Sequence, residues 1–316
     1  MPFAPLLTCE AIGRRSASNG HFQMTGERFT NVVKPTAGGY AVATLASTFS
    51  LKERRPDLFS GTPRAHAIDR WIFVFMAAWF IAIVLAGFIP DALMKIGMVE
   101  AGQRPPFPLI MHLHAVAMGS FLLLLLAQAG LMATGRSELH MRVGIAAFAL
   151  VPILVVVGFI LAPTMYHQLW NMAQSGPPSQ QQRLQETLRV MDDILLLQIR
   201  AGILFALFMT IGLRARKAHS GLHKRMMFLA PAVALGAAID RMTWLPTTLP
   251  ASAVASDMYI LAALSPMFVW DVIRNKRVHE AYLVWIAICL PVTLVLYSLW
   301  DTPWWHGTAR LIMAVR

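Results

Sequence analysis

The sequence predicts an all-α protein, a polytopic membrane helix bundle with seven transmembrane helices. Of its 316 residues, 57% are hydrophobic and only 14% are charged, whereas a soluble domain carries about 25% charged residues. The mean hydropathy of +0.56 agrees with this composition. Seven apolar runs, each near the ~20 residues that cross a bilayer core, fill most of the chain after residue 70. These observations exclude a soluble enzyme, a disordered chain and a fibrous protein.

Each apolar run is predicted to be a helix, because the bilayer core offers no water to satisfy open backbone groups. The runs comprise residues 71–89, 108–134, 143–163, 194–213, 226–245, 251–270 and 281–300. The sixth run is the least regular, since it contains Asp257 and follows Pro250. Residues 1–70 are polar and hold nine Lys and Arg residues. We therefore expect a disordered basic cytoplasmic tail, 1–70, and a seven-helix transmembrane domain, 71–316.

Lys and Arg residues gather on one side of the predicted membrane. The tail and the loops at 135–142, 214–225 and 271–280 hold 19 of the 27, and the opposite loops with the C-terminal segment hold six. The positive-inside rule then predicts a cytoplasmic N-terminus and an outside C-terminus, in a bacterial inner membrane. The formal net charge of +11 falls in short loops between apolar runs. This distribution favours anionic lipids as partners and excludes nucleic acid.

Charged residues inside the predicted helices are candidate functional residues, because an ionisable group in a membrane is costly. Asp193 and Arg200 are seven residues apart and share one stripe of a helix, while Asp240 and Arg241 lie on the next predicted helix. We expect a buried charge pair, either Arg200 with Asp240 or Asp193 with Arg241. Such a pair would fix the helix register, or it would form a proton-handling or anion-binding site open to the outside water.

A stripe of methionine and histidine opens the second predicted helix. Met111, His114 and Met118 stand at positions i, i+3 and i+7 and share one face. Imidazole and thioether ligands suit haem iron or Cu(I). His112 lies about 200° round the helix from His114, so the two cannot bind one metal ion. The alternative interpretation is that the methionines fill the core and the histidine caps the helix mouth.

Histidines are expected on both faces of the membrane. His114 and His167 belong to the predicted outer face, while His140, His223 and His279 stand beside basic residues at predicted cytoplasmic helix ends. A protein with a haem near each face needs histidines in such places on several helices. Histidines beside Lys or Arg at helix ends also contact lipid phosphates or cap carbonyl groups.

Three segments of the chain resemble a known group. The segments are HLHAVAMGSFLLLLLAQAGLMATGRSELHMRVG, HKRMMFLAPAVALGAAIDRM and RVHEAYLVW. The pattern H-x-H, G-R-x-x-L-H-R-x-x-G and H-K-R-x-M resembles that of uncharacterised bacterial multi-pass membrane proteins over most of residues 71–310. The second and third elements are distantly similar to cytochrome oxidase assembly-type and cytochrome b561-type proteins. The resemblance implies that the positions to examine are His112, His114, His140, His223, Asp193 and Arg241.

Three functions stay open on the sequence. The first is haem b or copper binding, for electron transfer or respiratory oxidase assembly, with a respiratory complex or a second copy as partner. The second is transport of a small polar or amphipathic solute, with or without protons. The third is a non-catalytic accessory or scaffold role. Enzyme activity is also open, since Tyr166, His167 and Asp193 could carry out acid–base chemistry at an outer cleft.

Overall fold

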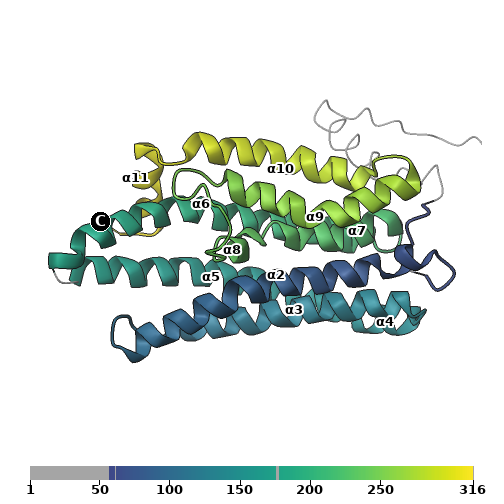
Figure 1. Cartoon of the computed structure of the whole chain (residues 1–316), viewed down its shortest axis with the longest axis horizontal. Coiled ribbons are helices and arrows are strands. Elements are labelled where there is room, and N and C mark those ends of the chain that lie inside the picture. The colour runs from purple at the N-terminus through teal and green to yellow at the C-terminus, as the bar shows by residue number, and fades with distance from the viewer. Residues whose placement is uncertain (1–56, 61, 176–177, 316) are drawn as a thin grey trace, which may run out of the picture. The chain divides into compact units, whose positions relative to one another are not determined.

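The computed structural model describes residues 57–60, 62–175 and 178–315, and every regular element within them is a helix (Figure 1). The helices are α2 (Ala67–Glu100), α3 (Leu109–Ala133), α4 (Ser137–Val143), α5 (Ala146–Ser175), α6 (Pro178–Ala215), α7 (Ser220–Ala232), α8 (Gly236–Ile239), α9 (Val254–Asn275), α10 (Glu280–Leu299) and α11 (Pro303–Ile312). Seven segments are long and apolar enough to cross a membrane, namely α2, α3, α4 with α5, α6, α7 with α8, α9 and α10. The prediction of an all-α chain with seven such helices is confirmed.

The long helices run side by side and alternate in direction (Figure 1). One end of the bundle contains residues 57–66, α4 and the turns at 216–219 and 276–279, and we call it the basic end. The other end contains the 101–108 turn, the 240–253 loop and α11, and we call it the α11 end.

Helices α5 and α6 are longer than their predicted apolar runs. At 1.5 Å per residue, the 38 residues of α6 extend about 57 Å, well beyond the ~30 Å bilayer core. Their extra turns lie at the α11 end (Figure 1). Hydropathy marks only the apolar half of such a helix. The polar segment 181–193 continues the helix because Gln, Arg, Glu and Leu are good helix formers.

The fifth span begins six residues before the predicted run of 226–245. Helix α7 starts at Ser220, so that Arg225 lies inside it, and the helical span ends at Ile239. A charged residue can be placed there because Arg225 is fully paired with acidic side chains, as described below. Asp240 and Arg241 consequently follow the span instead of lying within it.

The described chain before residue 70 is also ordered by contacts with the bundle. Helix α2 begins at Ala67, and the side chain of His66 accepts a hydrogen bond from the Ile68 backbone N–H at 3.3 Å. Asp69, in the first turn, is fully buried and binds the indole N–H of Trp270 at 2.7 Å and the guanidinium of Arg274 at 2.9 Å. The predicted domain boundary at residue 70 thus falls within a helix, and the predicted tail, for residues 1–56, lies outside the described residues.

The outward faces of the helices are apolar. On α3, Leu109, Val116 and Leu123 follow one another at seven-residue intervals and are 74%, 69% and 63% exposed. A soluble protein rarely presents such a continuous apolar stripe, whereas a lipid-facing helix needs one. The inward faces form a core among α2, α3, α6, α7, α9 and α10, and a second, smaller cluster surrounds Tyr166, Trp300 and Trp305 at the α11 end.

One glycine sets the distance between α2 and α8. A Cβ on Gly87 would overlap the carbonyl oxygen of Ala238 and lie 2.7 Å from its carbonyl carbon. The two backbones can approach this closely only where the side chain is a hydrogen atom, as is common between packed membrane helices. Gly97, ten residues later on the same helix, has no such neighbour within 4 Å.

Candidate functional site

A charged pair lies inside the bundle, among three of the spanning helices. Arg200 of α6 donates to both carboxylate oxygens of Asp257 on α9, at 2.7 and 2.9 Å. Tyr297 of α10 donates to the same carboxylate at 2.5 Å, and Arg200 also donates to the Thr293 hydroxyl at 3.2 Å. The side chain of Arg200 is only 8% exposed. These four residues, which we call the Arg200 cluster, therefore form a bidentate ion pair satisfied by two hydroxyl groups.

The predicted partner of Arg200 was wrong. Asp240 is not paired with Arg200, because the span ends before it, and it accepts a hydrogen bond from Ser256 instead. Asp257, the residue that made the sixth apolar run irregular, is the partner. The pair is formed across 57 residues of sequence, a separation at which helix periodicity gives no information about partners.

The predicted pairing of Asp193 with Arg241 was also wrong. Arg241 contacts Asp91 of α2 at 3.2 Å, and Asp91 in turn binds Lys95 at 2.6 Å. Asp193 is 3% exposed and accepts a hydrogen bond from the backbone N–H of Asp301 at 2.9 Å. Each of the four residues of the two predicted pairs thus has a partner other than the predicted one.

Polar side chains follow one face of α10 toward the α11 end. Cys289, Thr293 and Tyr297 are four residues apart on α10. Residues at this interval lie one above another on a helix. Two of them, Thr293 and Tyr297, belong to the Arg200 cluster.

A second polar cluster joins α5, α6 and α11 at the α11 end. Asp192 is fully buried, and one of its carboxylate oxygens accepts from the Tyr166 hydroxyl at 2.6 Å. Its other oxygen lies 3.2 Å from Nδ1 of His306 and 3.7 Å from Nε of Arg310. The Trp305 indole donates to the backbone carbonyl of Asp192 at 2.7 Å. Asp192 is thus the centre around which α11 is docked.

His306 connects this cluster to the protein surface. Its Nε2 lies 3.1 Å from Asp301, which also accepts from Nε of Arg189 at 3.2 Å. The contact with His306 lowers the pKa of the Asp301 carboxyl below its ordinary value. Asp193, Asp301 and His306 each offer one possible ligand atom, and these three atoms lie within 4.8 Å of one another. The sequence indicated Asp193 but not His306 or Asp301, since neither lies in an apolar run or in a recognisable metal-binding spacing.

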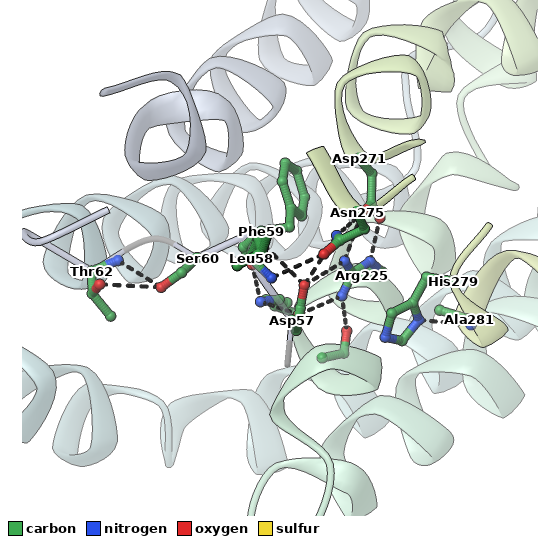
Figure 2. A network of polar contacts seen from close by, with 12 residues as sticks. Asp57, Leu58, Phe59, Ser60, Thr62, Arg225, Asp271, Asn275, His279 and Ala281 are labelled. Atoms are coloured by element: carbon green, nitrogen blue, oxygen red, sulfur yellow. Dashed lines mark hydrogen bonds and ion pairs between the residues drawn. The ribbon is translucent and has the colours of Figure 1, made fainter. Parts of the chain in front are cut away.

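A third network, at the basic end, surrounds Arg225 (Figure 2). Arg225 of α7 is fully buried, and its guanidinium binds Asp271 of α9 through Nε and through Nη2, the latter at 2.7 Å. It binds Asp57 at 3.0 and 3.1 Å and the Gly221 carbonyl at 2.9 Å. Asn275 donates to both carboxylates, at 3.2 and 2.6 Å. All five N–H directions of the guanidinium are used, which is typical of an arginine that holds segments together.

Electrostatics keep the groups around Arg225 in fixed charge states. Although burial raises the pKa of the Asp57 carboxyl, Arg225 and then Lys224 hold it well below its ordinary range. Burial and the charge of Arg225 lower the pKa of His279 to about 3. His279 is therefore neutral at physiological pH, and its Nδ1 accepts the Ala281 backbone N–H at 3.1 Å as the N-cap of α10. Because their charges are fixed and their hydrogen bonds join separate segments, we interpret the residues around Arg225 as a cluster that stabilises the fold.

The methionine and histidine stripe of α3 faces α5 at His114. A Cβ on Gly158 of α5 would lie 3.8 Å from Cε1 of His114, an ordinary contact distance, so the imidazole packs beside this part of α5. Nδ1 of His114 is buried and has no hydrogen-bond partner among the described residues. Met118 packs against the apolar core, whereas His112 lies against the ring of Phe107.

The other predicted histidine ligands contact backbone groups. Nδ1 of His223 lies 2.8 Å from the carbonyl of Gly212, and Nε2 of His167 lies 2.6 Å from the carbonyl of Met313. Nδ1 of His140 lies 3.3 Å from the backbone carbonyl of Gln128. His140 and His223 both lie at the basic end, and His167 lies at the α11 end. The five candidate histidines are thus distributed over both ends of the bundle.

Comparison of the chain with protein-family models, with curated proteins and with solved structures found no match.

Proposed function

We propose that this chain is a proton-coupled transporter of a small solute in a bacterial inner membrane, with its basic end in the cytoplasm. The Arg200 cluster is its proton-handling site. The concentration of 19 of 27 Lys and Arg residues on one side supports the orientation. The observation that carries the function is the Arg200–Asp257 pair, because ionisable residues on spanning helices generally serve transport or proton transfer.

The Arg200 cluster has the chemical groups that proton transfer requires. Asp257 can bind a proton, and the hydroxyl of Tyr297, 2.5 Å away, can pass one to it. The carboxylate accepts three hydrogen bonds in all, from Arg200 and Tyr297. Protonation of Asp257 would release the charged contact with Arg200. A change of charge at one carboxylate would therefore change the link between α6 and α9.

Apolar side chains separate the Arg200 cluster from the basic end. Toward that end α6 presents Leu204 and Phe208, which are buried. On α10, Cys289 follows Thr293 in the same direction, and the next residue at this interval, Trp285, is buried. Toward the α11 end, Asp193 precedes Arg200 by seven residues on α6, about 10 Å along the axis. We therefore propose that protons reach the cluster from the α11 end, past side chains that include the buried Leu196.

We expect Asp257→Asn to lower proton flux into proteoliposomes by at least about tenfold, equivalent to ~1.4 kcal/mol of barrier. The amide keeps the shape of the side chain but cannot carry the proton. Flux is measured with an enclosed pH-sensitive dye under an imposed potassium diffusion potential. Asp91→Asn, in an ion pair with Arg241 and Lys95 away from the cluster, is the matched control and should conduct as the original chain does. Equal flux in all three proteins, or none in the original chain, would contradict the proposal and favour a scaffold role.

A second function, haem or copper binding, is favoured by the unpartnered Nδ1 of His114. A buried polar atom without a partner calls for a specific explanation, and a metal ion bound with Met111 and Met118 would provide one. We expect protein purified from copper- and haem-sufficient cells to carry copper or a b-type absorption spectrum in its reduced form. His114→Ala should abolish it and His112→Ala, on the other side of α3, should not. A protein free of both would contradict this second proposal without affecting the first.

A further inference from the structure

His306 faces a carboxylate with each of its two ring nitrogens. Nδ1 lies 3.2 Å from Asp192 and Nε2 lies 3.1 Å from Asp301. A neutral imidazole carries one N–H, so one of these contacts would set a nitrogen lone pair against an oxygen lone pair. The arrangement therefore needs something more between His306 and one carboxylate. That is either a further proton, on the ring or on a carboxyl group, or a metal ion.

Asp192 determines which nitrogen carries the ring proton. It is the deeper of the two carboxylates, fully buried, and its other oxygen is already occupied by the Tyr166 hydroxyl. An N–H on Nδ1 completes its hydrogen bonds and leaves the lone pair of Nε2 directed toward Asp301. A buried carboxylate that orients a histidine in this way is the usual arrangement behind a histidine metal ligand.

Asp193 is a second carboxylate near His306, besides Asp301, that could bind the same ion. It is 3% exposed, and its hydrogen-bond partner among the described residues is the backbone N–H of Asp301. No Lys, Arg or His side chain of the described chain forms an ion pair with it. A buried carboxylate is normally paired or coordinates a metal. One of its oxygens lies within 4.8 Å of ligand atoms of both Asp301 and His306.

We propose that Asp193, Asp301 and His306 bind a divalent transition-metal ion at the α11 end, with Asp192 orienting His306. One imidazole and two carboxylates suit Zn²⁺ and similar ions, and three protein ligands leave a position for water. Tetrahedral bonds of about 2.1 Å separate ligand atoms by about 3.4 Å. His306 and Asp301 already lie near that separation, and Asp193 must approach them. The side chain of Asp301 is 60% exposed, which opens the site to solution.

This inference does not depend on the proposed transport function. The three ligands lie on α6, on α11 and in the turn between α10 and α11, apart from the Arg200 cluster. They are also distinct from His114 on α3. A metal ion here would fasten α11 to α6, next to the end of the polar stripe on α10.

The test uses the full chain, purified with a tag that contains no histidine and stripped with a chelator. We expect it to bind one Zn²⁺ per chain in calorimetric titration with ZnCl₂. Asp301→Asn and His306→Gln should each weaken binding by at least about 100-fold, because loss of a direct ligand costs more than the 10–100-fold typical of an orienting residue. His114→Ala should bind Zn²⁺ as the original chain does.

Asp301→Asn is the safest variant, since that side chain lies largely at the surface and its loss leaves the buried contacts of Asp192 in place. Absence of Zn²⁺ binding would overturn the proposal, as would equal affinity in the original chain and both ligand variants. His306 would then be an imidazolium that donates to both carboxylates. Co²⁺ adds a spectroscopic measurement, since tetrahedral coordination should give visible absorption that Asp301→Asn lacks.

Discussion

Replacement of Arg225 with alanine is expected to destabilise the folded chain by about 3–5 kcal/mol, the typical cost of breaking a buried ion pair from one side. Removal of the guanidinium leaves Asp271 buried without its arginine partner and leaves Asp57 with Lys224 alone. It also releases the link between α7 and α9. The measurement is thermal unfolding in detergent, with the fraction of protein that stays monodisperse as the readout at each temperature.

Two further variants separate charge from packing at this position. Arg225→Met combined with Asp271→Asn should recover part of the lost stability, because the double change removes a buried negative charge together with the positive one. Lys224→Ala should cost much less, since the Lys224 side chain is 22% exposed and its salt bridge is partly screened. Equal stability of Arg225→Ala and Lys224→Ala would show that the network does not hold the bundle together.

Substitution of Gly87 with alanine is expected to cost about 3 kcal/mol or more, at the upper end of overpacking effects. The new methyl group meets backbone atoms of Ala238, which cannot rotate away as a side chain can. Helix α2 would have to separate from α8 along its whole contact. Unfolding in detergent and the yield of membrane-inserted protein are the two measurements.

Gly97→Ala is the matched control, because it adds the same methyl group to the same helix where no atom lies within 4 Å. It should be neutral or slightly stabilising, since alanine favours helix more than glycine does. If both variants had the same stability, the close contact between α2 and α8 would not be a determinant of the fold.

The spanning helices could be predicted because each depends on local composition. An apolar run long enough to cross a bilayer has no stable alternative to a helix in that environment. The helix ends could not be predicted in the same way. Arg225 lies within α7 because Asp57, 168 residues away, neutralises it. The polar turns of α6 before Asp192 are stabilised by helix propensity and by contact with α11, neither of which a hydropathy pattern records.

The candidate functional residues also fall into those that local sequence could indicate and those that depend on distant contacts. Arg200 and Asp193 could be identified because a charge in or beside an apolar run is conspicuous by itself. Asp257 also stood out within the sixth apolar run, but its pairing with Arg200 did not. The pairings could not be predicted, since Asp257, Asp301 and His306 lie 57 to 114 residues away along the chain from the α6 residues they join. The roles of Thr293 and Tyr297 could not be predicted either, because they depend on which helices α10 faces.

Helix α9 is held by an arginine at each of its ends. Asp257 and Asp271 are 14 residues apart, about 21 Å along the axis, and they lie near one face because 14 residues make almost four turns. Arg200 of α6 holds the first and Arg225 of α7 holds the second. A slide or a tilt of α9 against α6 and α7 must break at least one of these ion pairs, so the pairs oppose such a movement. Among the described residues, α3 takes part in no ion pair. We therefore expect any rocking motion of the bundle to occur between the group of α6, α7 and α9 and the apolar side that contains α3.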